Sequence, residues 1–368
     1  TKVGYPDGTS IKYVYEDDTY PFLLTGIIDQ DSNRIATWTY DRFGRAVSVS
    51  GANGVNAYQF TYQPDDRYVK VTDPLGTVRT LTYQNSQGQL IMTSSDDPCA
   101  NFGRDVASKT VGYNAQVTRI TDYKGNQTLL GYNSRNLVTN ITRAWNTGSQ
   151  MVTQLQYSPS FRLPTLIQEP GKTDQRSYDA TGNLIQQTLT DTTTGNTRTR
   201  SATYDSYGRL LTRTDADGNV TRYAYDGKGN LASITDALGH TTSFTHDADG
   251  RLLTKTDPNG LETKYTYDAV GRMVSRTVGT ERTAYTYDPA GNLILVTLPS
   301  GYTLKLTYDA AHRLVGVKDS LGDRLVYTLN TMGNRVDEKL YDPDGTQVYS
   351  HSRIYDALDR LEKDIAAG

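Results

Sequence analysis

The segment Tyr204-Asp205-Ser206-Tyr207-Gly208-Arg209-Leu210 sets a frame that returns along the chain. It reappears as Tyr225-Asp226-Gly227-Lys228-Gly229-Asn230-Leu231, so the shared pattern is Tyr-Asp-x-x-Gly-Arg/Asn-Leu. The Tyr positions at 204, 225, 246, 267, 287 and 308 are spaced by 21, 21, 21, 20 and 21 residues, with His246 in place of one Tyr. A fixed period of this length indicates a repeat architecture.

Further copies of the frame extend over the whole length of 368 residues. Weaker copies are centred on Tyr62, Tyr83, Tyr132 and Leu329-Asn330, the last followed by Gly333. The predicted structural residues of the repeat are Tyr40, Asp41, Gly44, Tyr178, Asp179, Gly182, Tyr204, Asp205, Gly208, Tyr225, Asp226, Gly229, Asp247, Gly250, Tyr267, Asp268, Gly271, Tyr287, Asp288, Gly291, Tyr308, Asp309, Tyr355 and Asp356. The sequence predicts one continuous array over residues 1–368, with irregular stretches near 85–113 and 143–175 that are longer loops or decayed repeats.

A second turn signal, Asp-x-x-Gly, repeats in step with the first. Its Asp residues, each ten positions before a Tyr position, are Asp73, Asp122, Asp215, Asp236, Asp257 and Asp319. The Asp carboxylate can accept bonds from backbone N–H groups one to two residues on, and the Gly can supply a positive φ. Each repeat is therefore predicted to hold two strands and two turns.

The stretch 252–267 illustrates the prediction. Residues 252–256 form one strand, Asp257 to Gly260 reverse the chain, and residues 261–267 form the next strand. In the second strand Leu261, Thr263, Tyr265 and Tyr267 alternate with polar residues, the period of a sheet with one packed and one wet face. With 28 Tyr and 32 Gly in the chain, the predicted fold class is all-β.

Charge and cysteine content exclude several classes of partner. The 38 basic and 41 acidic residues are spread evenly, so nucleic acid is not an expected partner. Cys99 is the one thiol and cannot form an internal disulfide; we expect a free thiol in an irregular loop. No apolar run reaches the ~18 residues of a membrane span, and no signal peptide is visible.

No catalytic, cofactor or metal site is expected from the motifs. The four histidines, His240, His246, His312 and His351, lack metal-ligand spacing and are predicted to be structural. Asp29, Asp215 and Asp247 open segments like the start of a calcium loop, but each lacks the later Gly and Glu of a complete site. There is no nucleophile elbow and no P-loop.

On these residues the chain resembles the Rhs/YD-repeat family, and the resemblance covers nearly its whole length. It implies a long antiparallel β-sheet ribbon that coils into part of a hollow shell. The family includes bacterial Rhs toxins, the B and C components of Tc toxin complexes and animal teneurins. The opening segment, from Tyr5-Pro6-Asp7-Gly8 through Tyr40-Asp41, resembles bacterial Rhs proteins more than teneurins.

The resemblance implies a non-catalytic scaffold, secreted or delivered at the cell surface of a bacterium, that encapsulates and helps deliver a C-terminal toxin. The implied partners are that toxin domain, the rest of the shell and components of a secretion system. Asp257-Pro258-Asn259-Gly260-Leu261 matches the short self-cleavage string of the family, but its position in the repeat predicts an ordinary turn. The alternative function is an adhesin or carbohydrate-binding surface, since Tyr-rich sheets can offer stacking platforms to sugars.

The ends of the array carry a further prediction. Repeat arrays need caps, and unpaired terminal strands tend to pair with other chains. We therefore expect the 368-residue chain to enclose no sealed cavity, and to self-associate through edge strands or to form a piece of a larger shell.

Overall fold

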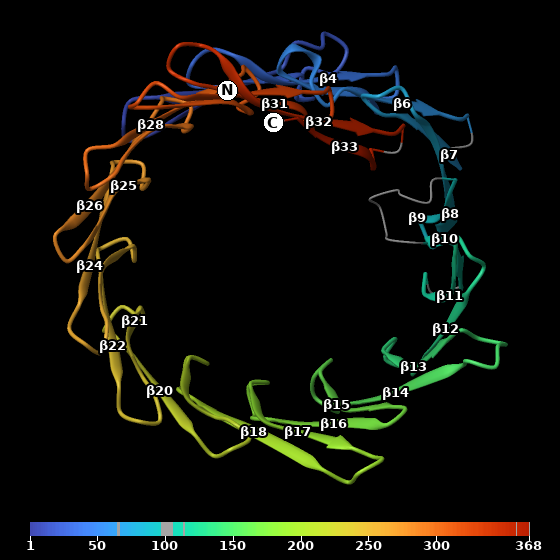
Figure 1. Ribbon diagram of the computed structural model, residues 1–368. Coiled ribbons are helices and arrows are strands. Elements are labelled where there is room, and N and C mark those ends of the chain that lie inside the picture. The colour runs from blue at the N-terminus through green and yellow to red at the C-terminus, as the bar shows by residue number, and fades with distance from the viewer. Residues whose placement is uncertain (65–66, 97–105, 113–114, 358, 368) are drawn as a thin grey trace. The chain divides into compact units, whose positions relative to one another are not determined.

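The computed structural model describes residues 1–64, 67–96, 106–112, 115–357 and 359–367 (Figure 1). These residues form β-strands joined by short turns, with one 3₁₀ helix, η1 (Ala52–Gly54), so the all-β prediction is confirmed. Cys99 lies outside the described residues. No helix among the described residues is long and apolar enough to cross a membrane.

The chain divides into two compact units, each described here by itself. Unit 1 joins Thr1–Thr80 to Thr263–Gly368, and unit 2 is Leu81–Glu262. The early strands of unit 1 are β1 (Lys2–Gly4), β2 (Ser10–Val14), β3 (Gly26–Ile28), β4 (Arg34–Tyr40), β5 (Ala46–Gly51), β6 (Tyr58–Tyr62) and β7 (Tyr68–Thr72). Its late strands are β25 (Met273–Val278), β26 (Glu281–Tyr287), β27 (Leu293–Thr297), β28 (Thr303–Tyr308), β29 (Leu314–Asp319), β30 (Arg324–Leu329), β31 (Arg335–Tyr341), β32 (Gln347–Tyr355) and β33 (Leu361–Ala367).

Unit 2 contains the middle strands of the array. Its strands are β9 (Gln89–Ser95), β10 (Val106–Val111), β11 (Val117–Asp122), β12 (Gln127–Tyr132), β13 (Val138–Arg143), β14 (Met151–Tyr157), β15 (Pro164–Glu169), β16 (Lys172–Tyr178), β17 (Leu184–Asp191), β18 (Thr197–Tyr204), β19 (Leu210–Thr214), β20 (Val220–Tyr225), β21 (Leu231–Thr235), β22 (Thr241–His246) and β23 (Leu252–Thr256). Strands β8 (Val78–Ser86) and β24 (Glu262–Tyr267) cross the unit boundaries. The stretch 143–175 therefore holds hairpins rather than one long loop.

The described strands belong to one antiparallel sheet of 33 strands. Consecutive strands pair as hairpins, and a register shift recurs at the Tyr position, for example between Thr203 and Tyr204 where β18 pairs with β19. A bulge of this kind, beside a turn with a positive-φ residue, strengthens the local twist of a sheet. Strand β1 pairs with β2 and β33 pairs with β32, and among the described residues these two end strands are not paired with each other, so the sheet is not closed there. The predicted antiparallel ribbon is confirmed.

The sheet has little conventional core. Among the described residues no large side chain is fully buried. In β24 the predicted alternation holds from Thr263, which is buried, to the exposed Lys264 and Thr266. Leu261 does not follow the alternation, since it is 48% exposed. Its N–H bonds to Asp257 and closes the preceding turn, so Leu261 belongs to that turn rather than to the strand. Cross-strand pairs and turns must therefore supply much of the stability that a core supplies elsewhere.

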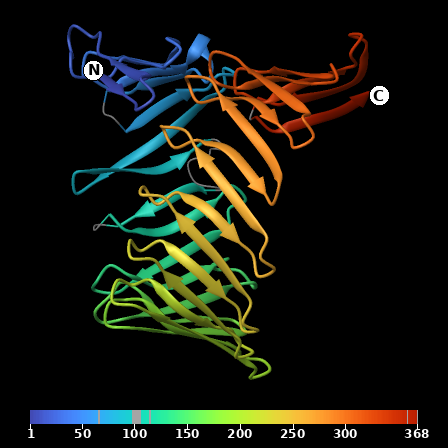
Figure 2. The same ribbon diagram turned by 90° about the vertical axis from the view of Figure 1, so that its left-hand side faces the viewer.

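Within unit 1 the early turns contact the late turns. In both views the N-terminal strands lie beside strands near the C-terminus (Figures 1 and 2). Among the described residues, six pairs make these contacts: Asp7 with Arg272, Asp29 with His312, Asn56 with Thr331, Tyr58 with Met332, Pro74 with Thr331, and Thr77 with Ala357. Hydrogen-bonded partners here are 257 to 280 residues apart in sequence. We call this set of contacts the seam.

Candidate functional site

The feature that repeats most faithfully is the five-residue turn that starts at the Asp of Tyr-Asp. We number its residues 1 to 5 and call it the YD turn; the Asp-x-x-Gly turn at the other end of the hairpin is the mid-repeat turn. In the turn 205–209, the Asp205 N–H donates to the Arg209 carbonyl at 3.0 Å and the Gly208 N–H donates to the Asp205 carbonyl at 3.0 Å. Both turn types share this geometry, since Asp236 and Gly239 make the same bonds.

The Asp side chain closes the turn from inside. Asp205 Oδ1 accepts the N–H groups of Tyr207 and Arg209 at 2.9 and 3.0 Å. The acceptor role predicted from sequence is confirmed for the N–H two residues on, and the structure adds the N–H four residues on. Because a buried or half-buried N–H needs a partner, one carboxylate oxygen satisfies two donors at once.

The side chain at position 5 of the YD turn donates a hydrogen bond to the same carboxylate. An Arg there donates Nε to Asp Oδ2 at 2.6 to 2.8 Å, and an Asn donates Nδ2 at 2.8 to 3.0 Å. The Arg residues are Arg45, Arg209, Arg251, Arg272, Arg313 and Arg360, and the Asn residues are Asn183, Asn230 and Asn292. Sequence reasoning found the Arg/Asn alternation but missed its cause, which is that both side chains carry a donor to the Asp.

The tyrosines connect each repeat to the one before it. The Tyr225 hydroxyl donates to the Leu210 carbonyl at 3.0 Å, and the Tyr204 hydroxyl donates to the Leu184 carbonyl at 3.1 Å. Seven more Tyr hydroxyls do the same: Tyr40, Tyr62, Tyr132, Tyr157, Tyr178, Tyr287 and Tyr308. The acceptor is a backbone carbonyl 14 to 20 residues earlier. Each bond therefore joins neighbouring hairpins, and we call the series the tyrosine ladder.

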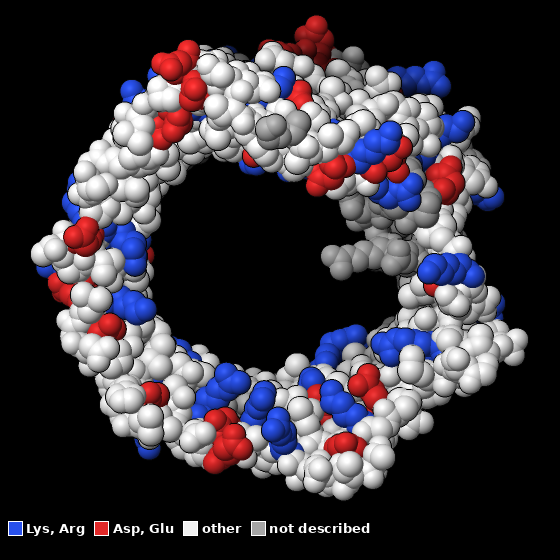
Figure 3. Space-filling model, viewed as in Figure 1, with Lys and Arg blue, Asp and Glu red and all other residues white. Residues whose placement is uncertain are grey.

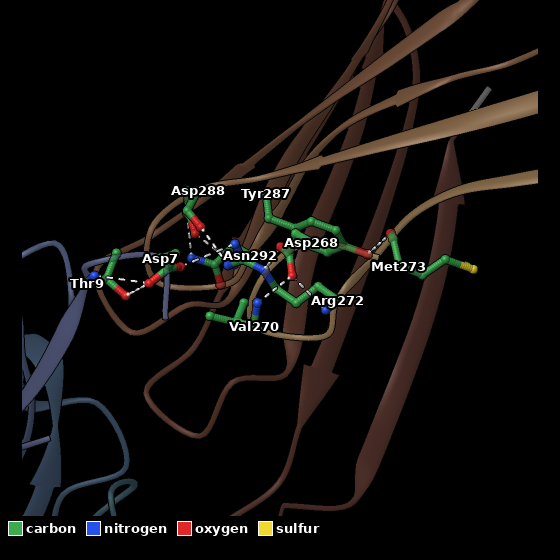
Figure 4. Close-up of polar contacts among 9 residues, drawn as sticks. All are labelled: Asp7, Thr9, Asp268, Val270, Arg272, Met273, Tyr287, Asp288 and Asn292. Carbon is green, nitrogen blue, oxygen red and sulfur yellow. Dashed lines mark hydrogen bonds and ion pairs between the residues drawn. The ribbon is translucent and has the colours of Figure 1, made fainter. Parts of the chain in front are cut away.

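The turn arginines also stack on the ladder. The guanidinium of Arg209 lies 4.8 Å from the ring centre of Tyr225 in the next repeat, and Arg272 lies 5.1 Å from that of Tyr287. Figure 4 shows Arg272 between its own Asp268 and the Tyr287 ring, with the Tyr287 hydroxyl on the Met273 carbonyl. A cation over an aromatic face adds a further attraction between repeats.

Hydrogen bonding holds the turn carboxylates in their charged form. The side-chain hydrogen bond from Asn230, followed by backbone N–H bonds, lowers the pKa of Asp226. Asn183 and Thr181 lower the pKa of Asp179 in the same way. Burial acts to raise the pKa of Asp309, but the bonds from Arg313 outweigh it and the pKa is lowered. Burial also raises the pKa of the ladder residues Tyr287 and Tyr308.

Position 4 of the turn requires a positive φ. Gly239 and Gly260 close two of the Asp-x-x-Gly turns in which the sequence predicts a glycine with positive φ, and their φ values of 88° and 83° confirm the prediction. In three YD turns the position holds a polar residue other than Gly, namely Asn136, His312 and Asp359, with φ near 60°. Each of these side chains bonds the position-5 residue of the preceding YD turn, respectively Gln116, Asn292 and Asn334.

The histidines and calcium-like segments take structural places. His240 is at position 5 of a mid-repeat turn, with Nδ1 2.9 Å from Asp236 Oδ2. The Asn219 side chain donates a hydrogen bond to the Asp215 carboxylate, and the Arg251 side chain donates one to the Asp247 carboxylate. Donors from the same turn therefore bond these carboxylate oxygens. Among the described residues no group of three or more His, Cys, Asp and Glu could hold a metal ion.

Asp257 to Leu261 form a mid-repeat turn like the others. Asp257 Oδ1 accepts the N–H groups of Asn259 and Leu261, both at 2.9 Å, and the Gly260 N–H donates to the Asp257 carbonyl. The self-cleavage string therefore has the geometry of a repeat turn.

Surface hollows and charges follow the repeat. A hollow of about 240 Å³ is lined by the ladder residue Tyr204 together with Leu184, Leu210, Arg200 and Arg213. Acidic and basic side chains are mixed over much of the face in Figure 3. Many of these charges are paired inside single turns, as in the Arg313–Asp309 pair at 2.7 Å.

Comparisons with known proteins agree with this geometry. The family model described as teneurin YD-shell matches residues 112–283 and 175–361, and the model described as RHS repeat matches residues 40–78. A search of curated protein sequences gave no match.

Solved structures share the fold. The crystal structure of TcdB2-TccC3 aligns with a TM-score of 0.59 and 16% identity over 91% of this chain and 23% of that chain. The complex TcdB2-TccC3-Cdc42 aligns with a TM-score of 0.59 and 15% identity over 98% and 24%. The Photorhabdus luminescens Tc holotoxin pore, carrying a TccC3 mutation, aligns with a TM-score of 0.59 and 17% identity over 90% and 22%. The chain thus spans about a quarter of the length of these proteins. Because the teneurin YD-shell model matches more than half of its length, the chain belongs to the YD-shell family.

Proposed function

We propose that the chain is a non-catalytic part of the wall of an Rhs/YD-repeat shell that encloses a C-terminal toxin and helps to deliver it. The observation that carries the proposal is the use of the polar residues. Asp, Arg, Asn and Tyr of the repeats bond to each other and to neighbouring backbone, as Asp205, Arg209 and Tyr225 do. Such side chains build a continuous sheet with no need of a thick core.

Family membership supports a structural shell role for the chain. In this proposal residues 1–368 form a single array, and the Tyr, Asp and Gly residues of the repeat are its structural elements. Its partners are the rest of the shell, the toxin domain of the same polypeptide or complex, and secretion-system components. The location that fits is outside the producing cell, secreted or delivered at a cell surface.

The ladder geometry argues against the carbohydrate-binding alternative. A sugar platform needs an open aromatic face, whereas the Tyr225 ring is covered by Arg209 and its hydroxyl is bonded to Leu210. Binding on a glycan array that is lost on Tyr207→Ala, an exposed aromatic side chain, would favour the alternative.

The proposal can be tested by protease protection in the natural full-length protein. Residues downstream of the array should resist protease in the wild type and become accessible in Asp309→Ala, which removes the acceptor of a YD turn. Gly227→Ala is the matched control, because Gly227 has no positive φ and a Cβ there meets nothing within 4 Å. Equal digestion of the downstream residues in wild type and Asp309→Ala would contradict an enclosing role.

A further inference from the structure

The YD turn 309–313, which lies at the seam, departs from the repeat at position 4, where most copies have a glycine with a positive φ. Position 4 is Gly at 44, 182, 208, 229, 250, 271, 291 and 333, with φ between 75° and 96°. His312 fills this position with φ of 60°. A non-glycine residue in the left-handed region is disfavoured, so the local backbone gives no reason for His312.

The His312 ring is held from both sides by residues far apart in sequence. Its Nδ1 lies 2.8 Å from Nδ2 of Asn292 in the preceding repeat. Its Nε2 lies 3.0 Å from Oδ2 of Asp29 in the early segment, and the Asp29 side chain is only 2% exposed. A glycine at 312 would leave that buried carboxylate without its imidazole partner.

The hydrogen-bond donors and acceptors are consistent from end to end. The Asn292 amide donates one hydrogen to Asp288 Oδ2 at 2.8 Å and the other to His312 Nδ1. With Nδ1 accepting, the neutral imidazole carries its proton on Nε2 and donates it to Asp29. Asp29 Oδ1 in turn accepts the Asn33 N–H at 2.7 Å, which closes the early turn. An unbroken chain of hydrogen bonds therefore links a late YD turn to an early turn.

The next late turn departs from the repeat as well. Leu329-Asn330 stands in place of Tyr-Asp, and this turn supplies Thr331 to the seam. The Thr331 carbonyl accepts the Asn56 N–H at 3.0 Å, and its hydroxyl donates to the Pro74 carbonyl at 3.1 Å. Two successive departures from the motif thus coincide with contacts to the early segment.

We propose that His312, paired with Asp29, fixes the register in which the late hairpins of unit 1 dock on its early hairpins. The YD turns can make many similar contacts, so a sheet of near-identical repeats needs a distinctive pair to choose one alignment. The His312 side chain at the glycine position and the buried Asp29 carboxylate that it contacts form such a pair. It acts as a positioning residue at an intramolecular interface.

The substitution His312→Gly distinguishes the register proposal from an explanation by local backbone energetics alone. The substitution restores the repeat glycine, so local backbone energetics predict a more stable protein. The register account predicts instead that the early turn 29–33 loosens. In hydrogen exchange on the full chain, the amides of Ser32 and Asn33 should exchange about tenfold faster, the loss expected for one bond to a charged group.

Asn136→Gly is the matched control. Asn136 has the same position and a φ of 59°, but its partner Gln116 belongs to the preceding turn of the same array segment. This variant should leave the amides of residues 29–33 unchanged. For the reciprocal test, Asp29→Asn should speed exchange of the Ala311 to Arg313 turn, whereas Asp31→Asn, in the same early turn, should not.

The double variant decides the outcome. If His312 and Asp29 act together, His312→Gly combined with Asp29→Asn should add little to either single change, since coupled residues are non-additive. Unchanged exchange at residues 29–33 in His312→Gly, with the same gain in stability as Asn136→Gly, would overturn the proposal. Fully additive effects of the two seam substitutions would overturn it as well.

Discussion

The YD turns of two stretches of the array have the same backbone geometry but contact different parts of the chain. In residues 205–230 both YD turns follow the motif, and their Arg and Tyr side chains bond neighbouring repeats. In residues 309–334 the motif is broken at His312 and at Asn330, and this stretch contacts the early segment of unit 1. In these two stretches, the motif residues serve contacts along the ribbon, whereas the departures at His312 and Asn330 accompany contacts to distant chain.

Acidification should weaken both stretches together and gives the largest expected effect. The folded-state pKa values of Asp226 in the first stretch and Asp309 in the second are lowered from 3.8, so their stabilising contribution is present above that value and is lost as pH falls through it toward the folded pKa. The melting temperature should be steady between about pH 7 and 5 and fall progressively below about pH 4. Equal melting temperatures at pH 6 and pH 3 would show that these carboxylates do not hold the turns.

Removing one turn carboxylate should give the largest effect of a single substitution. Asp309→Ala deletes the acceptor of the Ala311 and Arg313 N–H groups and of the Arg313 side chain. We expect a loss of about 3 kcal/mol in the free energy of unfolding, measured by denaturant titration.

Asp309→Asn is the matched change for this site. Asn330 already fills the same position at the seam, and its Oδ1 accepts the Met332 and Asn334 N–H groups. The Asn variant should therefore lose clearly less than the Ala variant. An equal loss in both would mean that the charge, rather than the two backbone bonds, carries the stability of the turn.

Valine substitutions at two position-4 glycines should distinguish the cost of backbone strain from the cost of steric crowding. Gly260→Val places a β-branched residue at φ of 83° with open space around its Cβ, and should cost about 1 kcal/mol or more from strain alone. Gly229→Val adds a contact at 2.9 Å with Nη1 of Arg209, so it should cost more and displace Arg209 from Tyr225. Thermal denaturation of both, with Gly227→Ala as control, checks the order; a larger loss at 260 than at 229 would refute it.

The ladder hydroxyls should contribute the smallest of these effects. Tyr225→Phe removes the bond to the Leu210 carbonyl and should lower stability by about 1 kcal/mol. Tyr223→Phe, in the same strand, is the control, because its hydroxyl makes no hydrogen bond with the described residues. Identical melting temperatures for the two variants would show that the hydrogen bonds of the tyrosine ladder do not stabilise the protein.

Much of the repeat could be predicted from sequence because its causes are local. The alternation in residues 252–267 and the glycine at 260 follow from strand period and turn conformation, which involve residues close in sequence. The role of Arg209 was missed because its two contacts, Asp205 and Tyr225, lie in different hairpins. A donor-bearing residue at position 5 of each YD turn that starts with Asp was the signal that could have revealed it.

The seam could not be predicted, because its partners are more than 250 residues apart and no periodic pattern relates them. The available signal was the loss of glycine at His312, which the sequence interpretation treated as an ordinary structural substitution.

One measurement tests the comparison most directly: hydrogen exchange of the full chain, carrying either Arg209→Ala or His312→Gly. Arg209→Ala should speed exchange only in adjoining repeats, from about β18 to β21, because its partners Asp205 and Tyr225 lie there. His312→Gly should speed exchange in the early turn of residues 29–33, far away in sequence. Exchange confined to the neighbouring late hairpins in the His312→Gly variant would contradict the claim that the broken motif at His312 serves a distant contact.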